Sequence, residues 1–365
     1  MSQAVYLDCN ATAPLRQEAA ALMVQVLEET GNASSVHGFG RRARQRVERA
    51  REEVAALVAA EPGQVVFTSG GTEANNLALT GTDRSRTLVS AGEHPSVLRA
   101  REDAELLALG SDGLVSLEPL SDAALVSVQM ANNETGVLQP LDRVVAAAHN
   151  AGALVHSDAV QAAGKIPIDF KALGLDLMSL SGHKLGGPQG AGALVVAEGV
   201  TLSPALRGGG QERRRRAGTE NVAAIAGFGA AAAVAKAELE GYQALAKLRD
   251  RLEQRLREIA PEVEIFGLEA PRLANTSCFA VRGLAAETQV MALDLDGIAV
   301  SSGAACSSGK VEPSHVLRAM GVEPELAACA LRVSLGRHNT PEDIERLLAS
   351  WTAHYNRGRK QTSAA

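Results

Sequence analysis

Polar and ionisable residues follow five short apolar runs of this sequence, at the point where each run ends. These polar segments cover residues 68–73, 93–95, 132–136, 156–161 and 181–184. A single segment of this kind has an ordinary structural explanation, such as a helix cap, a turn asparagine or a surface lysine. Five of them are harder to explain in that way, because ligands bind where the carboxyl ends of parallel strands meet. The spacing therefore predicts a ligand site at one edge of a sheet.

The residue types in these segments suit the binding of pyridoxal phosphate. That cofactor needs a fixed lysine for covalent attachment and a carboxylate that keeps its ring nitrogen protonated. It also needs a flat side chain over the ring and a helix start whose free N–H groups bind the phosphate. Residues 68–73 contain two glycines suited to such a helix start but lack the Gly-Lys-Ser/Thr ending of a nucleotide P-loop. Taken alone, that segment is equally well explained as a tight turn.

The elements that would position these residues alternate along the chain from about residue 15 to residue 230. Apolar runs typical of buried strands cover residues 65–67, 87–89, 125–128, 153–155, 177–180 and 193–196. Helical patterns lie between most of them, at 41–60, 73–79, 95–109 and 141–150. Short buried strands that alternate with helices indicate an α/β domain built on a mostly parallel sheet.

The C-terminal part of the chain shows a mixed pattern. Apolar residues at every third or fourth position predict one long amphipathic helix over 234–259. After a break at 267–271, the pattern predicts strands at 276–281, 298–301 and 331–335 and helices at 286–293 and 342–354. We therefore expect a large α/β domain over residues 14–250 and a smaller α+β domain formed by residues 1–13 and 251–365.

The composition argues against several classes of protein. The chain has 365 residues and a net charge of −6, whereas nucleic-acid-binding proteins carry a basic surplus. No apolar run approaches the roughly 18–20 residues of a membrane span, and no signal-peptide pattern opens the chain. The four cysteines are widely scattered, which argues against a disulfide framework or a structural zinc site. We therefore expect free thiols in a reducing cytoplasm.

Cys306 lies in a setting unlike that of the other three cysteines. Residues 301–309 around it are serine, glycine and alanine, which cannot anchor a core and therefore favour a mobile loop. A thiol on such a loop can enter a cavity, accept a sulfur atom and leave with it. Cys278 and Cys329 lie in apolar segments, and together with Cys9 they are expected to be small packing residues.

Ordered sequence blocks run along nearly the whole chain. They cover residues 6–8, 31–37, 69–76, 93–94, 132–136, 158–161, 181–184, 208–213, 216–221, 301–309 and 331–337. With these blocks the chain resembles the cysteine desulfurases of the NifS/IscS type, in the class V aminotransferase family of fold-type I pyridoxal-phosphate enzymes. The resemblance implies a large, mostly parallel α/β domain that binds the cofactor and a smaller α+β domain that carries the catalytic cysteine loop.

The resemblance also implies the main catalytic roles. Lys184 would bind pyridoxal 5'-phosphate covalently, and His94 would stack on its ring and act as acid and base. Cys306 would be the nucleophile, and Arg332 would bind the substrate carboxylate through two parallel hydrogen bonds. No resident metal is implied, and Cys306 would at most ligate a cluster transiently together with a scaffold partner.

The cofactor-binding residues implied by the resemblance come from several blocks. They are Gly71, Thr72, His94, Asn133, Asp158, Gln161, Ser181, His183, Lys184 and Thr219. Asp158 would pair with the ring nitrogen, and Gln161 and Asn133 would bind the region of the ring hydroxyl. Thr219 would reach the phosphate from the partner subunit, so we expect a homodimer.

The activity implied by the resemblance is the desulfuration of L-cysteine. Sulfur would pass to Cys306 as a persulfide, leaving L-alanine, and then move to an iron–sulfur scaffold or another acceptor protein. A selenocysteine lyase or another class V aminotransferase-like enzyme is the alternative within the family. A catalytically silent partner-binding homologue is disfavoured, because Lys184 and Cys306 are both present.

Three features depart from the family pattern. Cys9 stands where the family usually has another residue, and Ala33 replaces a common proline. Arg214, where glycine is common, completes an arginine run over 213–216. The run suggests either a charged loop near the phosphate or the dimer edge, which we favour, or a contact with an acidic partner or nucleic acid.

Overall fold

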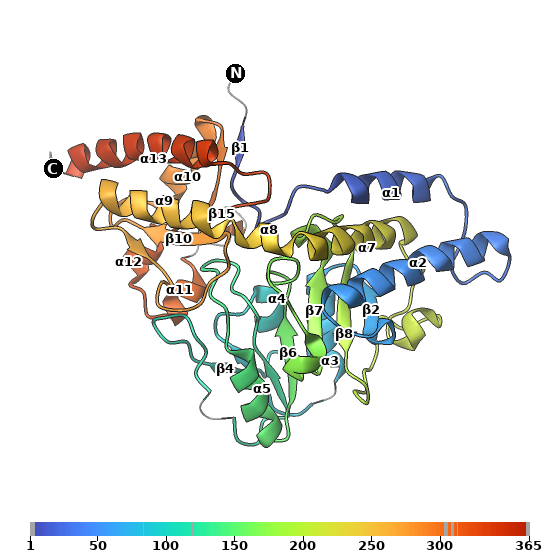
Figure 1. The fold of residues 1–365 in the computed structure, drawn as a ribbon. Coiled ribbons are helices and arrows are strands. Elements are labelled where there is room, and N and C mark those ends of the chain that lie inside the picture. The colour runs from blue at the N-terminus through green and yellow to red at the C-terminus, as the bar shows by residue number, and fades with distance from the viewer. Residues whose placement is uncertain are drawn as a thin grey trace.

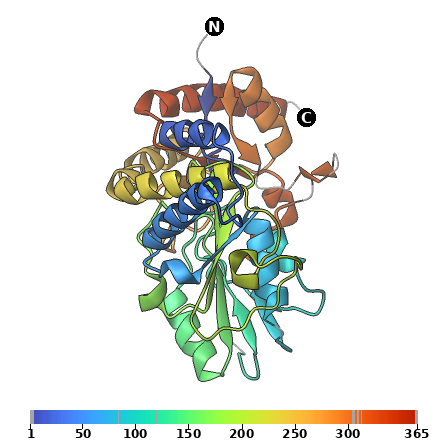
Figure 2. The same ribbon diagram turned by 90° about the vertical axis from the view of Figure 1, so that its right-hand side faces the viewer.

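The computed structural model describes residues 4–82, 84–117, 120–302, 306–307, 310–311 and 313–362. Figure 1 shows a larger part built around a sheet and a smaller part to which both ends of the chain lead. In both views the smaller part lies above the main sheet (Figures 1 and 2).

Seven strands form the main sheet. They are β2 (Val65–Thr68), β3 (Thr87–Ser90), β4 (Glu105–Leu107), β5 (Leu125–Ser127), β6 (Leu154–Asp158), β7 (Leu177–Ser181) and β8 (Gly192–Val196), in the spatial order β2-β8-β7-β6-β5-β3-β4. Strand β8 is antiparallel to both its neighbours, and all other pairs are parallel. The carboxyl ends of the five strands that precede the polar segments therefore share one edge of the sheet, as predicted.

Helices cover both faces of this sheet. They are α1 (Gln17–Leu27), α2 (Gly38–Leu57), α3 (Gly71–Gly81), α4 (Pro95–Leu98), α5 (Leu141–Asn150), α6 (Phe170–Leu173) and α7 (Val222–Ala237), with 3-10 turns at Pro62–Gln64, Gly182–Lys184 and Gln211–Arg214. Val65 and Phe67 of β2 share one apolar core with α2, α5 and α7, whereas Val66 between them shares another with α3. This alternation of side chains explains why the strands read as continuous apolar runs.

The smaller part has its own sheet and its own core. Its strands are β1 (Val5–Tyr6), β9 (Glu264–Ile265), β10 (Thr276–Ala280), β11 (Ile298–Ala299), β12 (Ser301–Ser302), β13 (Cys306–Ser307), β14 (Lys310–Val311) and β15 (Leu331–Ser334), and its helices are α8 (Leu239–Gln243), α9 (Ala246–Ile259), α10 (Ala286–Leu295), α11 (His315–Ala319), α12 (Pro324–Ala327) and α13 (Pro341–Thr362). The order β12-β15-β10-β9 is antiparallel throughout, and β1 pairs in parallel with β11. Val5 and Leu7 pack in one core with Trp351, so the start of the chain lies against its last helix.

The prediction of one long helix over 234–259 is wrong. Helix α7 ends at Ala237, and α8 and α9 follow at an angle of 69° to it. The buried face of α7 is mostly alanine and glycine, so the apolar stripe seen in the sequence belongs to the next helices. Among the described residues no single helix is long and apolar enough to cross a membrane, and only this bent pair meets the criteria of length and composition together.

The predicted helix over 95–109 is also largely wrong. Helix α4 ends at Leu98 after about one turn, and β4 then pairs in parallel with β3 at the edge of the sheet. Leu107 is buried whereas Leu106 is 65% exposed, which is the alternation of a strand. The apolar residues of this segment pack against a neighbouring strand, and that context overrides the local helical spacing.

Candidate active site

The carboxyl ends of the sheet strands border a cavity of about 370 Å³. The segment after β1 and strand β15 of the smaller part also line it. The residues predicted from the sequence that line this cavity are Gly71, Thr72, His94, Asn133, Asp158, Gln161, Ser181, His183, Lys184 and Arg332. The structure therefore brings residues from distant parts of the chain into one space.

Gly71 opens helix α3 at the cavity, and its lack of a side chain matters there. A Cβ atom at this position would lie 2.8 Å from Cγ2 of Val160 and 3.5 Å from Cβ of Ser181. Glycine thus lets the first turn of α3 lie against Val160, beside Ser181 at the end of β7. The first N–H groups of a helix have no partner inside it and attract anions. Gly71, Thr72 and Ser181 therefore lie at an end of the cavity that suits an anion, the candidate anion-binding end.

Lys184 follows β7 on a 3-10 turn and lines the same cavity. Its Nζ atom donates hydrogen bonds to the carbonyl oxygens of Asn10 (2.5 Å) and Ala11 (2.9 Å). Burial, followed by the charge of Arg332, lowers the pKa of Lys184 from 10.5 to about 8. Burial and the charge of Lys184 also lower the pKa of His183 to about 4. Near neutral pH the site therefore holds a neutral imidazole and an amine that loses its proton more readily than a free lysine.

Asp158, the last residue of β6, is buried beside the cavity. Its carboxylate oxygens accept hydrogen bonds from Nδ2 of Asn75 (2.7 Å) and from the N–H of Val160 (2.9 Å). Nδ2 of Asn75 also donates to Oγ of Ser96 (2.9 Å), which lies 2.7 Å from Nδ1 of His94. A chain of hydrogen bonds thus links the carboxylate to the imidazole. Sequence reasoning missed Asn75 and Ser96, although Asn75 lies in the block at 69–76.

His94 caps helix α4, and the residue before it is a buried acid. Nδ1 of His94 accepts the N–H of Ser96 (3.1 Å), so Nε2 remains for a ligand. Glu93 is fully buried, and neither carboxyl oxygen has a hydrogen-bond partner among the described residues. Burial, and then the charge of Asp158, raise the pKa of Glu93 well above its usual range. The surroundings of Glu93 therefore favour its protonated form.

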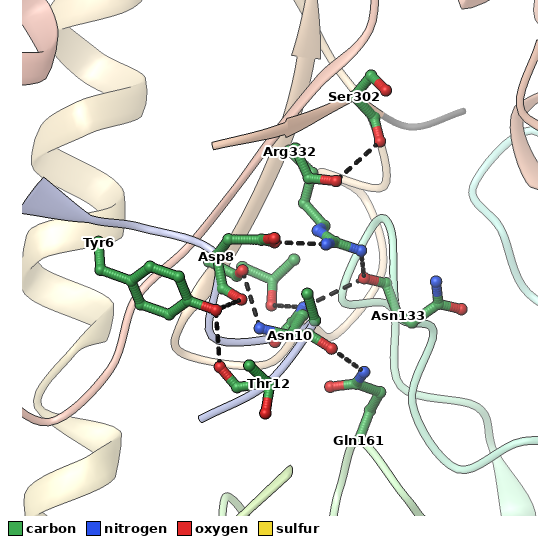
Figure 3. A network of polar contacts seen from close by, with 12 residues as sticks. Tyr6, Asp8, Asn10, Thr12, Asn133, Gln161, Ser302 and Arg332 are labelled. Atoms are coloured by element: carbon green, nitrogen blue, oxygen red, sulfur yellow. Dashed lines mark hydrogen bonds and ion pairs between the residues drawn. The ribbon is translucent and has the colours of Figure 1, made fainter. Parts of the chain in front are cut away.

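Arg332 on β15 reaches the cavity from the smaller part. Its Nη2 atom donates to Oδ1 of Asp8 (2.6 Å) and its Nη1 atom to the carbonyl of Asn133 (3.1 Å), as Figure 3 shows. Its Nε atom is buried and has no hydrogen-bond partner within the described part of the chain. Leaving a buried donor unsatisfied is unfavourable, so this N–H is suited to a ligand carboxylate.

Asn10, which sequence reasoning did not select, lies at the centre of the polar network in Figure 3. Its Nδ2 atom donates to Oγ1 of Thr276 (2.9 Å) and to the carbonyl of Asn133 (3.2 Å). Its Oδ1 atom accepts hydrogen bonds from Nζ of Lys165 (2.8 Å) and Nδ2 of Asn275 (3.1 Å). The side chain of Asn10 therefore links the two parts of the molecule. Its sequence signal was weak, because an asparagine after a short strand is typical of a turn.

Three of the four cysteines are buried free thiols, as the sequence predicted. They are Cys9, Cys278 and Cys329. Burial raises the pKa of Cys9 to about 12 and also raises that of Cys278, so neither thiol forms a thiolate readily. Cys306 belongs to β13, which pairs antiparallel with β14, and its side chain lies outside the described residues.

Thr219 and the arginine run are not among the residues that line the cavity. Thr219 is exposed, and Nε of Arg216 pairs with Oε1 of Glu73 in the first turn of α3 (2.8 Å). The run thus lies beside the anion-binding end, which favours its interpretation as a charged loop. Arg214 has a φ of 65°, a conformation that glycine adopts more easily, so the glycine common in the family fits this position.

Comparison with known proteins identifies the family. The model of the Aminotransferase class-V family matches residues 5–347. The cysteine desulfurase IscS of Methanosarcina thermophila is 40% identical over 367 residues, covering 95% of this chain and 91% of the relative. The structure of a NifS-like protein from Rickettsia africae has a TM-score of 0.91 at 36% identity and covers 97% of this chain and 100% of that one. The structure titled "SspA in complex with cysteine" has a TM-score of 0.78 at 27% identity and covers 92% of this chain and 100% of that one. The chain therefore belongs to the class-V aminotransferase family, a family of pyridoxal-phosphate enzymes that includes its cysteine desulfurase relatives.

Proposed function

We propose that this chain is a cysteine desulfurase that uses pyridoxal phosphate to remove sulfur from L-cysteine. The observation that carries the proposal is the single cavity lined by Lys184, Asp158 and Arg332. These residues supply an amine, a carboxylate and a cation with an unpartnered N–H, and each comes from a different element. The relatives named cysteine desulfurase, and the similar protein solved with cysteine, support L-cysteine as the substrate.

The residues present fit pyridoxal phosphate. The end of the cavity at Gly71, Thr72 and Ser181 suits the phosphate, because it offers helix N–H groups and a hydroxyl. The carboxylate of Asp158 suits a protonated ring nitrogen, and the amine of Lys184, with its lowered pKa, suits covalent attachment. When bound, this cofactor withdraws electrons from the substrate's α-carbon and so labilises the bonds around it.

The chain's own residues would orient the substrate and move its protons. The Nη atoms of Arg332 are already held by Asp8 and Asn133, so its Nε–H is preset to bind a carboxylate. Burial of His94 disfavours the charged imidazolium and lowers the pKa of this side chain, so a neutral ring is available as a base. Lys184, with a pKa of about 8, can both give and take a proton near neutral pH.

Cys306 is the sulfur acceptor in this proposal. Its thiolate attacks the sulfur of the substrate, so that a sulfur–sulfur bond forms while the carbon–sulfur bond breaks. The electron pair of the broken bond stays with the substrate, which takes up a proton and leaves as L-alanine. The other three cysteines are buried, and none of them lines the cavity.

A homodimer and an acceptor protein complete the proposal. Thr219 is exposed three residues after Arg216, which pairs at the anion-binding end, so this loop can contact a second copy of the chain. The persulfide would leave Cys306 for an iron–sulfur scaffold or another sulfur acceptor. Light scattering at assay concentration tests the dimer, and a fully active monomer would contradict it.

The activity is tested with purified protein, pyridoxal phosphate, L-cysteine and a thiol reductant. We expect alanine and sulfide in equal amounts, and mass spectrometry without reductant should place one extra sulfur on Cys306. Lys184→Ala should abolish both products. Cys306→Ser should still bind the cofactor but release almost no alanine. Full turnover by Cys306→Ser, or a persulfide on another cysteine, would disprove this assignment.

A further inference from the structure

We propose that Lys165, a buried lysine with no direct part in the reaction above, is a positioning residue. It determines in which direction the oxygen and nitrogen atoms of the Asn10 and Gln161 side-chain amides point. The inference rests on the proposed function, because its main readout uses the bound cofactor. Lys165 is 2% exposed, and no acidic side chain forms an ion pair with it among the described residues. A lysine buried in this way is rare, because burial disfavours its charge.

The surrounding chain directs Lys165 inward. Gly164 before it has a φ of 73°, in the left-handed region that favours glycine, and an added Cβ would lie 3.0 Å from Cβ of Ala235. The backbone carbonyl of Lys165 accepts a hydrogen bond from Nε2 of Gln243 on α8 (2.6 Å). The turn and this hydrogen bond fix the backbone on both sides of the residue. The inward position of Lys165 is thus built into the fold.

The amine of Lys165 contacts two amide side chains. Its Nζ atom donates to Oδ1 of Asn10 (2.8 Å) and to Oε1 of Gln161 (2.8 Å). A lysine ammonium has donors only, so the oxygen end of each amide must face it. This argument fixes both amide orientations, because the reversed orientation would place an N–H against the ammonium.

The nitrogen ends of these amides consequently face other partners. Nε2 of Gln161 donates to the backbone carbonyl of Asn10 (2.9 Å), the same oxygen that accepts Nζ of Lys184 (2.5 Å). An amide nitrogen carries two N–H groups, so one N–H of Gln161 is left for the cavity that this residue lines. Lys165 and the carbonyl of Asn10, which can only accept, together make Gln161 a donor toward the cavity, where it would favour a negatively charged oxygen of a bound ligand.

The charges near Lys165 are consistent with this role. Burial, and then the charge of Lys184, lower the pKa of Lys165 to about 7, and the other groups that act on it are Cys9 and Arg332. A neutral amine still donates hydrogen bonds. The amide orientations can therefore persist when the proton is lost, although the ammonium form enforces them more strongly.

The experiment compares the full-length protein with Lys165→Met, which keeps the length of the side chain and removes its donors. The readout is the pH titration of the visible absorption band of the bound cofactor. We expect the midpoint to rise by about one pH unit, as loss of one hydrogen bond to a charged group would cause. Lys171→Met, which removes an exposed lysine on α6, is the matched control and should leave the midpoint unchanged.

A double-mutant cycle separates positioning from the simple loss of a charge. If Lys165 acts through Gln161, Lys165→Met should shift the midpoint less than half as far in a Gln161→Leu background. Equal shifts with and without Gln161→Leu, or no shift when Lys165→Met is the only change, would overturn the proposal. Should Lys165→Met not fold, Lys165→Gln replaces it, because an amide has its own acceptor and no longer imposes an orientation. The same two outcomes then apply.

Failure of the proposed function would look different. An unmodified protein that shows no cofactor band, or that binds the cofactor but releases no alanine, contradicts the proposed function. An unmodified protein that does both, with a midpoint insensitive to Lys165→Met and Lys165→Gln, contradicts only the role of Lys165.

Discussion

Replacing Glu134 with glutamine should make the protein more stable at alkaline pH. Glu134 is buried in the segment between β5 and α5, and its carboxylate accepts a hydrogen bond from Oγ of Ser314 at the start of α11. Burial raises the pKa of Glu134 from 4.5 to about 7, against the opposing effects of the Ser314 hydrogen bond and the charge of Arg332. The folded protein therefore keeps a proton that the unfolded chain has already released.

The sign and size of the effect follow from this difference. Because the folded-state pKa is raised, the stabilisation is fully present below pH 4.5 and is lost as the pH rises to about 7. At about 1.4 kcal/mol per pH unit, the loss amounts to about 3 kcal/mol of the free energy of unfolding. Glutamine has no proton to lose. Glu134→Gln should therefore gain stability relative to the unmodified protein as the pH rises from 5 to 8, by roughly 2–3 kcal/mol.

Urea unfolding at several pH values between 5 and 8, followed by circular dichroism, measures this difference. Glu287→Gln, which changes an exposed carboxyl in the first turn of α10, is the control and should show no such trend. Ser314→Ala should widen the pH dependence, because it removes a hydrogen bond that favours the ionised form. A stability difference between Glu134→Gln and the unmodified protein that is constant across this pH range would refute the reasoning.

Three further changes test the site and its surroundings. Arg332→Lys should raise the KM for L-cysteine by about tenfold or more, since lysine lacks the Nε–H that the contacts of the two Nη atoms leave for a carboxylate; an unchanged KM in steady-state assays would contradict this role. Gly71→Ala should weaken the binding of pyridoxal phosphate, because its Cβ would lie 2.8 Å from Cγ2 of Val160, and equal affinities in a fluorescence titration would argue against it. Cys278→Ser should lower the free energy of unfolding by about 1–3 kcal/mol, through a buried hydroxyl, yet keep alanine release. Loss of activity in folded Cys278→Ser would show that this thiol does more than pack.

The sequence alone was enough to predict the general place of the site. The apolar runs at 153–155 and 177–180 lie in or beside strands β6 and β7, and Asp158 and Lys184 come within a few residues after these runs, so local patterning locates both at one sheet edge. The glycines at 70 and 71 likewise mark the start of a helix that opens at the cavity. Such features are local, because burial and periodicity are written into neighbouring residues. The same local reading failed at 95–109, where pairing with the preceding strand β3 decided the structure.

The tertiary structure decided which groups surround the site residues, and thereby their hydrogen-bond partners and their pKa values. Asn10 and Lys165 are separated by 155 positions in the chain, and no pattern in either segment indicates that Nζ of one binds the amide of the other. The same holds for Glu93, whose raised pKa follows from complete burial near the charge of Asp158. Hydrogen-bond partners and pKa values depend on every group packed around an atom, whichever part of the chain supplies it. The sequence by itself therefore determined the main strands and helices and the types of residue at their ends. The packing of distant segments determined the pKa values and orientations of those side chains, and it left the Nε–H of Arg332 without a partner among the described residues.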